Sequence, residues 1–271
     1  MNVITFLILL FSFFVNIGNA DAKDSFERIS QKQEIRCGYV VWPGNLEIDS
    51  NTGRLSGISY DFMEAIGKEL DYKIIWQEEV GWGTYAEGLN SGRYDMMCSP
   101  VWKSGQRAKI SLLTRTLFYE NMYGLAREDD NRFDKNLDAA NKKSITFAVI
   151  DGDITQKIRK TLFPDAQELA LSPISGSSPN MISVATKKAD ITMTNRKAME
   201  DYNRNNDKKL KLIIEGQAIR QFPSAFAMRI GDHDLKALID ATIETLQTNG
   251  VAQKIIEKNK ADLAPYLTNN Q

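Results

Sequence analysis

The apolar positions between residues 35 and 98 follow two different spacings. Short apolar runs, typical of buried strands, cover residues 35–41, 73–76 and 94–98. Between the first two runs, the apolar residues from Phe62 to Leu70 recur at helical spacing, and Gly92 ends a second, shorter helix before the third run. The pattern predicts the order strand, helix, strand, helix, strand.

The same order returns further along the chain. Strands are predicted over residues 145–150, 167–171 and 190–194. One helix is expected to begin at Gly152-Asp153 and another at Ser178-Pro179, where Pro suits the first helical position. Two copies of a strand-helix repeat predict an α/β protein with two lobes, each a mainly parallel sheet flanked by helices.

The chain is predicted to pass between these lobes twice, near residues 123–127 and near residues 220–224. A strong helix over residues 235–249 then returns to the first lobe. Two crossings make a hinge and leave a cleft between the lobes, which is a preferred position for a small ligand. The expected division is residues 23–124 plus 223–271 for lobe 1 and residues 125–222 for lobe 2.

The first 20 residues contain no charged side chain, and residues 3–15 are apolar except for Thr5 and Ser12. This run is shorter than the roughly 20 residues of a membrane span, and small residues follow it. The pattern predicts a secretory signal peptide over residues 1–22, cut after Ala20 or Ala22, and hence a periplasmic protein. An uncleaved N-terminal anchor is the alternative. No later segment is long and apolar enough to span a membrane.

The composition argues against several classes of function. Charged residues make up 25% of the 271 residues and the net charge is −1, so nothing in the bulk charge favours nucleic acid or an anionic membrane. His233 is the single histidine, which disfavours histidine-based metal sites and Ser-His catalysis. The two cysteines, Cys37 and Cys98, fall inside predicted strands, where buried cysteine acts as a small apolar residue. An exported protein can oxidise them, but free thiols are the expectation.

Candidate chemistry follows the strand over residues 94–98. The loop beyond it carries the hydroxyls of Ser99 and Ser104, the ring of Trp102 and the guanidinium of Arg107. In open α/β sheets, ligands bind beyond the carboxyl ends of the parallel strands. An arginine at this position is suited to a two-pronged contact with a carboxylate.

Four sequence blocks in order carry a family resemblance: Ile35-Arg36-Cys37-Gly38 followed by Trp42-Pro43, then Gly57-Ile58-Ser59-Tyr60-Asp61, then Trp82 to Arg107, then Ala227-Met228-Arg229-Ile230-Gly231-Asp232 before a helix ending at Asn249-Gly250. Together they resemble the two-lobed periplasmic solute-binding proteins that serve ABC importers, in the polar-amino-acid branch (bacterial extracellular solute-binding family 3). The resemblance runs from Glu34 to Pro265. It implies the type II periplasmic-binding fold.

The resemblance also implies a function and a site. Members of the family are monomeric receptors that close over a small solute and deliver it to a membrane permease, without a cofactor or a metal. The family's carboxylate-binding arginine matches Arg107, with Ser104 three residues before it. The ligand segment of the second lobe matches residues 151–155, where Asp151, Gly152, Asp153 and Thr155 surround a helix N-terminus able to receive an anion. The aromatic wall of the cleft falls near Tyr39 and Trp42.

Two positions depart from the family pattern. Amino-acid binders commonly place an acid, for the ligand's ammonium, at the position of Asn195 here, and a small hydroxyl residue at the position of Trp102. Losing a buried counter-charge for an ammonium is costly, so the ligand is not necessarily an ordinary α-amino acid. An aromatic-lined site also suits a larger, flatter molecule or a cation held over a ring.

Two other functions stay open. Some relatives on this scaffold eliminate water or carbon dioxide from cyclic acids. Here Asp151 and Asp153 are candidate acids, but no paired carboxylates are evident. A detached sensor that reports its ligand to a receptor is the other alternative. The expectation is a binding protein rather than an enzyme.

Overall fold

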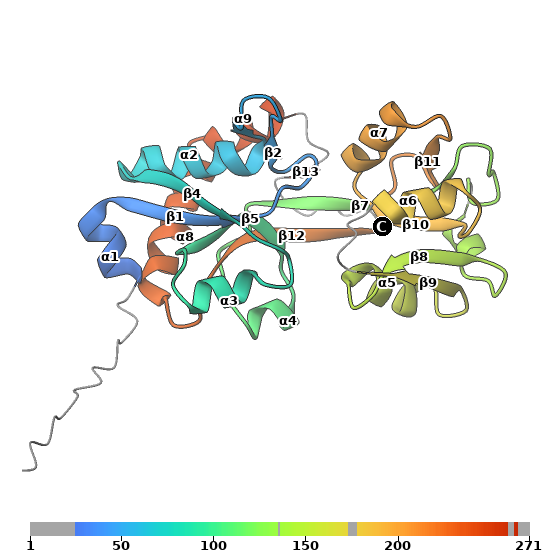
Figure 1. The fold of residues 1–271 in the computed structure, drawn as a ribbon, viewed down its shortest axis with the longest axis horizontal. Helices are drawn as coiled ribbons and strands as arrows, with labels where there is room; N and C mark the ends of the chain where they lie inside the picture. The colour runs from blue at the N-terminus through green and yellow to red at the C-terminus, as the bar shows by residue number, and fades with distance from the viewer. Residues whose placement is uncertain (1–24, 135, 173–177, 260–262, 265–271) are drawn as a thin grey trace, which may run out of the picture.

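The computed structural model describes residues 25–134, 136–172, 178–259 and 263–264. It shows two α/β lobes side by side, joined by two long strands (Figure 1). The predicted signal peptide lies outside the described residues. No helix within those ranges is long and apolar enough to cross a membrane.

The first lobe is built mainly from the N-terminal part of the chain. Its elements are α1 (Ser25–Lys32), β1 (Glu34–Tyr39), β2 (Glu47–Ile48), β3 (Leu55–Ser56), α2 (Ile58–Leu70), β4 (Lys73–Glu79), α3 (Tyr85–Asn90), β5 (Met96–Trp102), α4 (Gly105–Ala108) and β6 (Leu112–Leu113). After the second lobe the chain returns to it through α8 (His233–Thr248), α9 (Val251–Lys258) and β13 (Leu263–Ala264). The helix predicted over residues 235–249 is therefore confirmed as α8.

Strands β4, β1 and β5 of the first lobe lie in that order and run parallel. Their residues form a buried cluster with α2, α8 and α9, in which Phe62, Phe118 and Phe226 are fully buried. Burial of these apolar faces against the sheet is the main force that holds such a lobe together.

The second lobe repeats the plan. Its elements are η1 (Leu137–Ala140), β8 (Thr146–Ile150), α5 (Ile154–Leu162), β9 (Gln167–Leu171), α6 (Ser178–Ala185), β10 (Ile191–Thr194), α7 (Arg196–Asn205) and β11 (Leu210–Leu212). Strands β10, β8 and β9 run parallel, as the sequence pattern predicted. Two apolar clusters pack against this sheet, one under α5 and one under α6 and α7.

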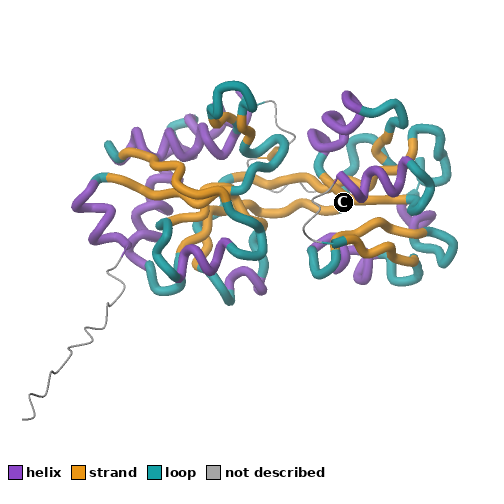
Figure 2. The backbone as a smooth tube through the Cα atoms, viewed as in Figure 1, coloured by secondary structure: helices purple, strands orange, loops and turns teal. Residues whose placement is uncertain are grey.

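Two long antiparallel strands join the lobes, β7 (Phe118–Arg127) and β12 (Arg220–Met228) (Figure 2). The first half of β12 pairs with β7, and its second half pairs with β5 of the first lobe. The second half of β7 pairs with β10 and β11 of the second lobe. Hydrogen bonding is therefore continuous from one sheet to the other, and the chain crosses between the lobes twice. The exact limits of the two lobes, which fall within these strands, stay a prediction.

The expectation of free thiols was wrong. Cys37 and Cys98 form a disulfide with a Cα–Cα distance of 5.4 Å. The two cysteines lie on β1 and β5, which are adjacent parallel strands. Parallel neighbours bring residues far apart in sequence to within disulfide distance, and the strand order that decides this is not visible in the sequence.

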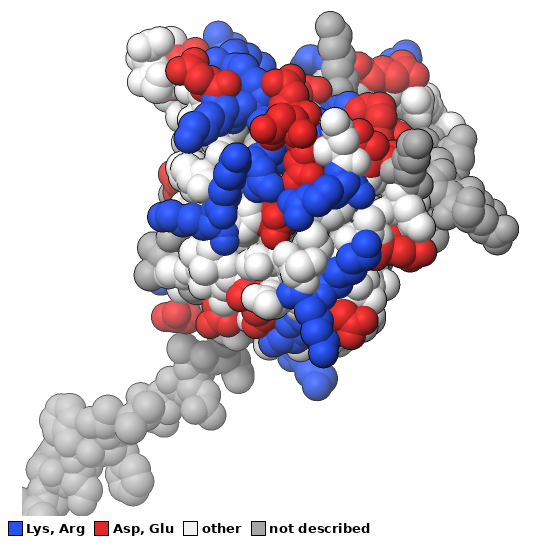
Figure 3. Space-filling model, turned by 90° about the vertical axis from the view of Figure 1, so that its right-hand side faces the viewer, with Lys and Arg blue, Asp and Glu red and all other residues white. Residues whose placement is uncertain are grey.

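The outer end of the second lobe carries both signs of charge. Figure 3 shows lysine and arginine side chains intermixed with aspartate and glutamate across this face. Within the second lobe, Arg132 bonds Asp130 at 2.6 Å and Asp190 at 2.5 Å, and Arg127 also bonds both acids. This surface has no single dominant sign.

Candidate functional site

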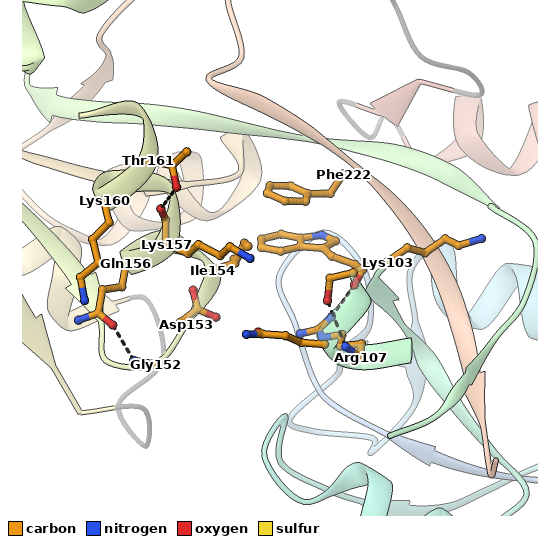
Figure 4. Close-up of a pocket in the computed structure, with 13 residues that line it drawn as sticks. Lys103, Arg107, Gly152, Asp153, Ile154, Gln156, Lys157, Lys160, Thr161 and Phe222 are labelled. Atoms are coloured by element: carbon orange, nitrogen blue, oxygen red, sulfur yellow. Dashed lines mark hydrogen bonds between the residues drawn. The ribbon is translucent and has the colours of Figure 1, made fainter. Parts of the chain in front are cut away.

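A cavity of about 330 Å³ lies between the lobes (Figure 4). One wall is the end of β5 with α4, the opposite wall is α5 with the turn before it, and Phe222 of β12 closes the hinge side. The volume is at the lower end of the range for small-molecule sites. Five of the residues predicted from the sequence line it: Trp102, Ser104, Arg107, Gly152 and Asp153.

Arg107 is fixed by its own loop. Ser104 caps the short helix α4 by accepting a hydrogen bond from the backbone N–H of Arg107 at 3.2 Å. The guanidinium donates to the carbonyl of Trp102 at 3.4 Å and lies 5.7 Å from the centre of the Trp82 ring, within cation–π range. No carboxylate in the described part of the chain forms an ion pair with it.

The surroundings of Arg107 leave its charge largely uncompensated. Burial lowers the pKa of this guanidinium, and electrostatic interaction with the acidic groups of Tyr85, Asp153 and Glu120 opposes the shift. Arginine stays protonated in proteins. A half-buried guanidinium without a carboxylate partner is stabilised when an anion enters the cavity and pairs with it. The geometry therefore suits carboxylate binding at this side of the cavity.

Trp102 and Phe222 form the aromatic floor of the cavity. Their rings stack with centroids 4.5 Å apart and planes inclined by 12°. The indole N–H of Trp102 donates to Glu120, whose other oxygen accepts from Asn45 Nδ2 at 2.9 Å. Glu120 is only 5% exposed, and burial raises the pKa of its carboxyl above the ordinary value. Glu120 therefore positions the ring of Trp102 and does not line the cavity itself.

The opposite wall includes the N-terminus of α5. Asp153 caps this helix, because its Oδ1 accepts from the backbone N–H and from the hydroxyl of Thr155, both at 3.0 Å. The N–H of Gly152 donates to the side chain of Gln156 at 3.2 Å. Gly152 has φ +71°, a left-handed conformation that glycine adopts without strain. Two of the amides expected to receive an anion are thus bonded within the segment.

Lys157 extends from the same helix. In Figure 4 its side chain extends from α5 into the cavity. The ammonium makes no ion pair with any residue that the structure describes. Lys157 and Phe222 were not among the residues predicted from the sequence. Lys157 follows the cap Asp153 by four residues, and this spacing places both on one face of the helix. That spacing is the signal that could have found it.

Six predicted residues do not line the cavity. Three lie in the first lobe: the hydroxyl of Ser99 bonds the backbone of Val40, Tyr39 packs against Trp76 with centroids 5.7 Å apart, and Trp42 packs against Trp82 at 6.2 Å.

The other three lie in the second lobe. Asp151 is exposed and bonds Gln156 at 3.3 Å, and Thr155 is buried beneath the cap of α5. Asn195 caps α7 by accepting from the N–H of Ala198 at 2.7 Å, and its amide approaches the carbonyl of Pro43 in the first lobe at 3.5 Å. Whether any of the six contacts a ligand stays a prediction.

No group of three or more histidine, cysteine, aspartate or glutamate side chains in the described ranges could hold a metal ion. The residues around the cavity are aromatic, amide, hydroxyl and charged side chains, which suit an organic solute.

Two parallel sheets, two hinge strands and a cavity between the lobes define the type II periplasmic-binding fold. Solved structures agree. The probable amino-acid ABC transporter extracellular-binding protein YtmK from Bacillus subtilis has a TM-score of 0.73 at 15% identity, covering 84% of this chain and 98% of that one. The ancestral amino-acid-binding protein AncCDT-1 has a TM-score of 0.70 at 20% identity, covering 87% and 98%.

The chain belongs to the bacterial extracellular solute-binding proteins, family 3, whose sequence profile matches residues 36–261. It is 24% identical over 260 residues to the L-cystine-binding protein TcyJ of Bacillus subtilis, covering 93% of both chains. It is 21% identical over 229 residues to a probable amino-acid ABC transporter-binding protein of Haemophilus influenzae, covering 84% of this chain and 85% of that one. The protein is therefore a solute-binding protein of a family whose members act outside the cytoplasm.

Proposed function

We propose that this protein is the periplasmic receptor of an ABC importer and that the cavity between its lobes binds a small carboxylate-bearing solute. The observation that carries the proposal is Arg107. Its guanidinium lies at the cavity, half-buried and without a carboxylate partner in the described chain. Removing such a cation from water is costly unless an anion pairs with it, so the solute supplies the missing partner.

The two lobes then close over the solute. Lobe 1 comprises residues 23–124 plus 223–271, and lobe 2 comprises residues 125–222. The solute stabilises the closed arrangement because it contacts both lobes. The signal peptide over residues 1–22 directs the chain to the periplasm, where a monomer meets the permease. The known proteins similar to this chain support this reading, because they include an L-cystine-binding protein and arginine-bound binding proteins.

The acids around the cavity favour binding over catalysis. One oxygen of Asp153 caps α5, and Glu120 is buried with both oxygens bonded. A general acid or base needs a titratable group within hydrogen-bond reach of the reacting proton. We expect no turnover of cyclic acids by the purified protein, measured by chromatography of the reaction mixture.

Native mass spectrometry tests the proposal directly. Protein purified from its own periplasm without denaturation is expected to retain a small carboxylate-bearing molecule, whereas Arg107→Ala protein prepared in parallel is expected to be empty. Retention of the same molecule by both proteins would remove Arg107 from the site. Loss of solute uptake, with signalling intact, in a strain lacking the gene would separate a transport receptor from a detached sensor.

A further inference from the structure

The cavity between the lobes carries an excess of positive charge. Among the described residues, its lining holds four basic side chains and one acidic one: Lys103, Arg107, Lys157, Lys160 and Asp153. The outer face of the second lobe, by contrast, mixes both signs (Figure 3). A low-dielectric cavity lined mainly by one sign of charge concentrates ligands of the opposite sign. The charge balance therefore favours an anionic solute over a neutral or cationic one.

The four basic side chains are not equivalent. Lys103 turns away from the cavity and donates to the carbonyl of Thr114 at 2.9 Å (Figure 4). Lys160 lies 3.9 Å from the carboxylate of Glu168. The ammonium of Lys157 has no ion pair within the described chain, and it points into the cavity (Figure 4). Arg107 and Lys157 are thus the two cations, one on each lobe, that remain for a ligand.

The backbone amides at the start of α5 are less suited to bind a carboxylate than Lys157 is. The N–H of Thr155 is bonded to Asp153 and the N–H of Gly152 to Gln156. A carboxylate entering here would have to displace these contacts and approach the charge of Asp153. Lys157, one turn further along the helix, is the better-placed donor on this wall.

We propose that the solute is a small dicarboxylate, with one carboxylate held by Arg107 and the other by Lys157. The inference rests on the proposed function, because it takes this cavity as the solute site. The carbon chain between the carboxylates lies against the stacked rings of Trp102 and Phe222. An amino group on that chain finds an acceptor in Asp153, so both amino and plain dicarboxylates are included.

Calorimetric titration of protein stripped of retained ligand by unfolding and refolding tests the proposal. L-Glutamate and L-glutamine form a matched pair, because they differ only in the second carboxylate; glutarate lacks the amino group, and L-arginine carries an extra cation. Wild-type protein is expected to bind L-glutamate or glutarate at least about tenfold more tightly than L-glutamine. Lys157→Gln is expected to remove most of that preference and to change L-glutamine affinity by less than about twofold.

Lys160→Gln is the matched control, since it removes the same charge from the same helix at a side chain that faces Glu168. The affinity of this variant for L-glutamate is expected to fall by less than about threefold. An equal loss of L-glutamate affinity in Lys157→Gln and Lys160→Gln would overturn the proposal. The effect would then come from the total positive charge of the helix and not from a contact made by Lys157.

Other outcomes separate this inference from the proposed function. If L-glutamine or L-arginine binds more tightly than either dicarboxylate, and Lys157→Gln does not change this, the dicarboxylate inference is overturned. The proposed receptor function is not affected by that result. If no probe binds, the mass of the ligand retained by native protein decides: a dicarboxylate supports the inference, and any other molecule overturns it. Absence of both binding and a retained ligand overturns the inference and the proposed function together.

Discussion

The indole N–H of Trp102 donates a hydrogen bond to the buried carboxylate of Glu120. Trp102 ends β5, while Glu120 belongs to the hinge strand β7. The same indole stacks on Phe222 of the other hinge strand. The floor of the cavity is therefore attached to both strands that join the lobes, and any movement about the hinge has to accommodate this ring.

The first prediction concerns this attachment. Trp102→Ala removes a stacked ring and leaves one oxygen of Glu120 without its donor, so we expect a loss of about 3 kcal/mol in the free energy of unfolding. Trp102→Phe keeps an aromatic ring and loses only the donor, which should cost about 1–3 kcal/mol. Urea denaturation of both single variants, of Glu120→Gln and of the double variant Trp102→Phe with Glu120→Gln measures the coupling. Strictly additive effects would contradict the contact.

The second prediction is a pH dependence. Burial raises the pKa of the Glu120 carboxyl above its ordinary value of 4.5. As pH rises from that value through the raised one, the native state keeps a proton that the unfolded state has released, so stability falls. Glu120→Gln removes this contribution. We expect the melting temperature of the variant minus that of the wild type to grow from pH 4.5 toward neutral pH, followed by differential scanning calorimetry. A constant difference would refute the assignment.

The third prediction isolates the geometry of the guanidinium. Arg107→Ala is expected to weaken carboxylate binding by about 2 kcal/mol or more, roughly thirtyfold, because a buried charged contact is lost. Arg107→Lys keeps the charge but not the planar two-pronged donor, so it should restore only part of the affinity. Both variants should melt close to the wild-type temperature. Full restoration by lysine would mean that charge alone matters at this position.

The fourth prediction concerns the disulfide. Cys37 and Cys98 are separated by 61 positions in the sequence. Removing a disulfide that closes a loop of this size lowers the free energy of unfolding by about 2–4 kcal/mol. The double variant Cys37→Ala with Cys98→Ala should show this loss in urea denaturation, and reduced wild-type protein should resemble it. Native protein denatured without reductant should take up no alkylating reagent. Modification of two thiols per chain would show that the bond is absent.

The fifth prediction addresses contact between the lobes. Lys197 of α7 reaches Glu47 in the first lobe at 3.2 Å and also pairs with Asp201 on its own helix. These side chains are well exposed, so the pair contributes at most about 1 kcal/mol. We expect Lys197→Ala to weaken solute binding by up to about fivefold at low salt, with a smaller effect at high salt. Arg204→Ala, which removes a pair confined to α7, is the control and should leave affinity unchanged.

Much of the fold follows from local pattern. The strand over residues 167–171 was predicted with the limits that the structure shows, and α5 begins directly after the predicted start at Gly152-Asp153. Both depend on spacing within one segment, which the sequence displays directly. The crossings at β7 and β12 were also predicted, because one has to connect the two repeats and the other has to return the C-terminal helix to the first lobe. The cap of α5 at Asp153 is a local feature of the same kind.

The sequence by itself determined the order of strands and helices in the two repeats, the presence of two lobes and an arginine shortly after β5. Only the tertiary structure decided that β1 and β5 are neighbours, and hence that Cys37 and Cys98 are bonded. It also decided that Glu120 and Phe222 meet Trp102. The physical reason is that periodicity and capping act between residues close in sequence. Partners across a sheet or a cleft are chosen by packing among distant segments, which leaves no spacing to read.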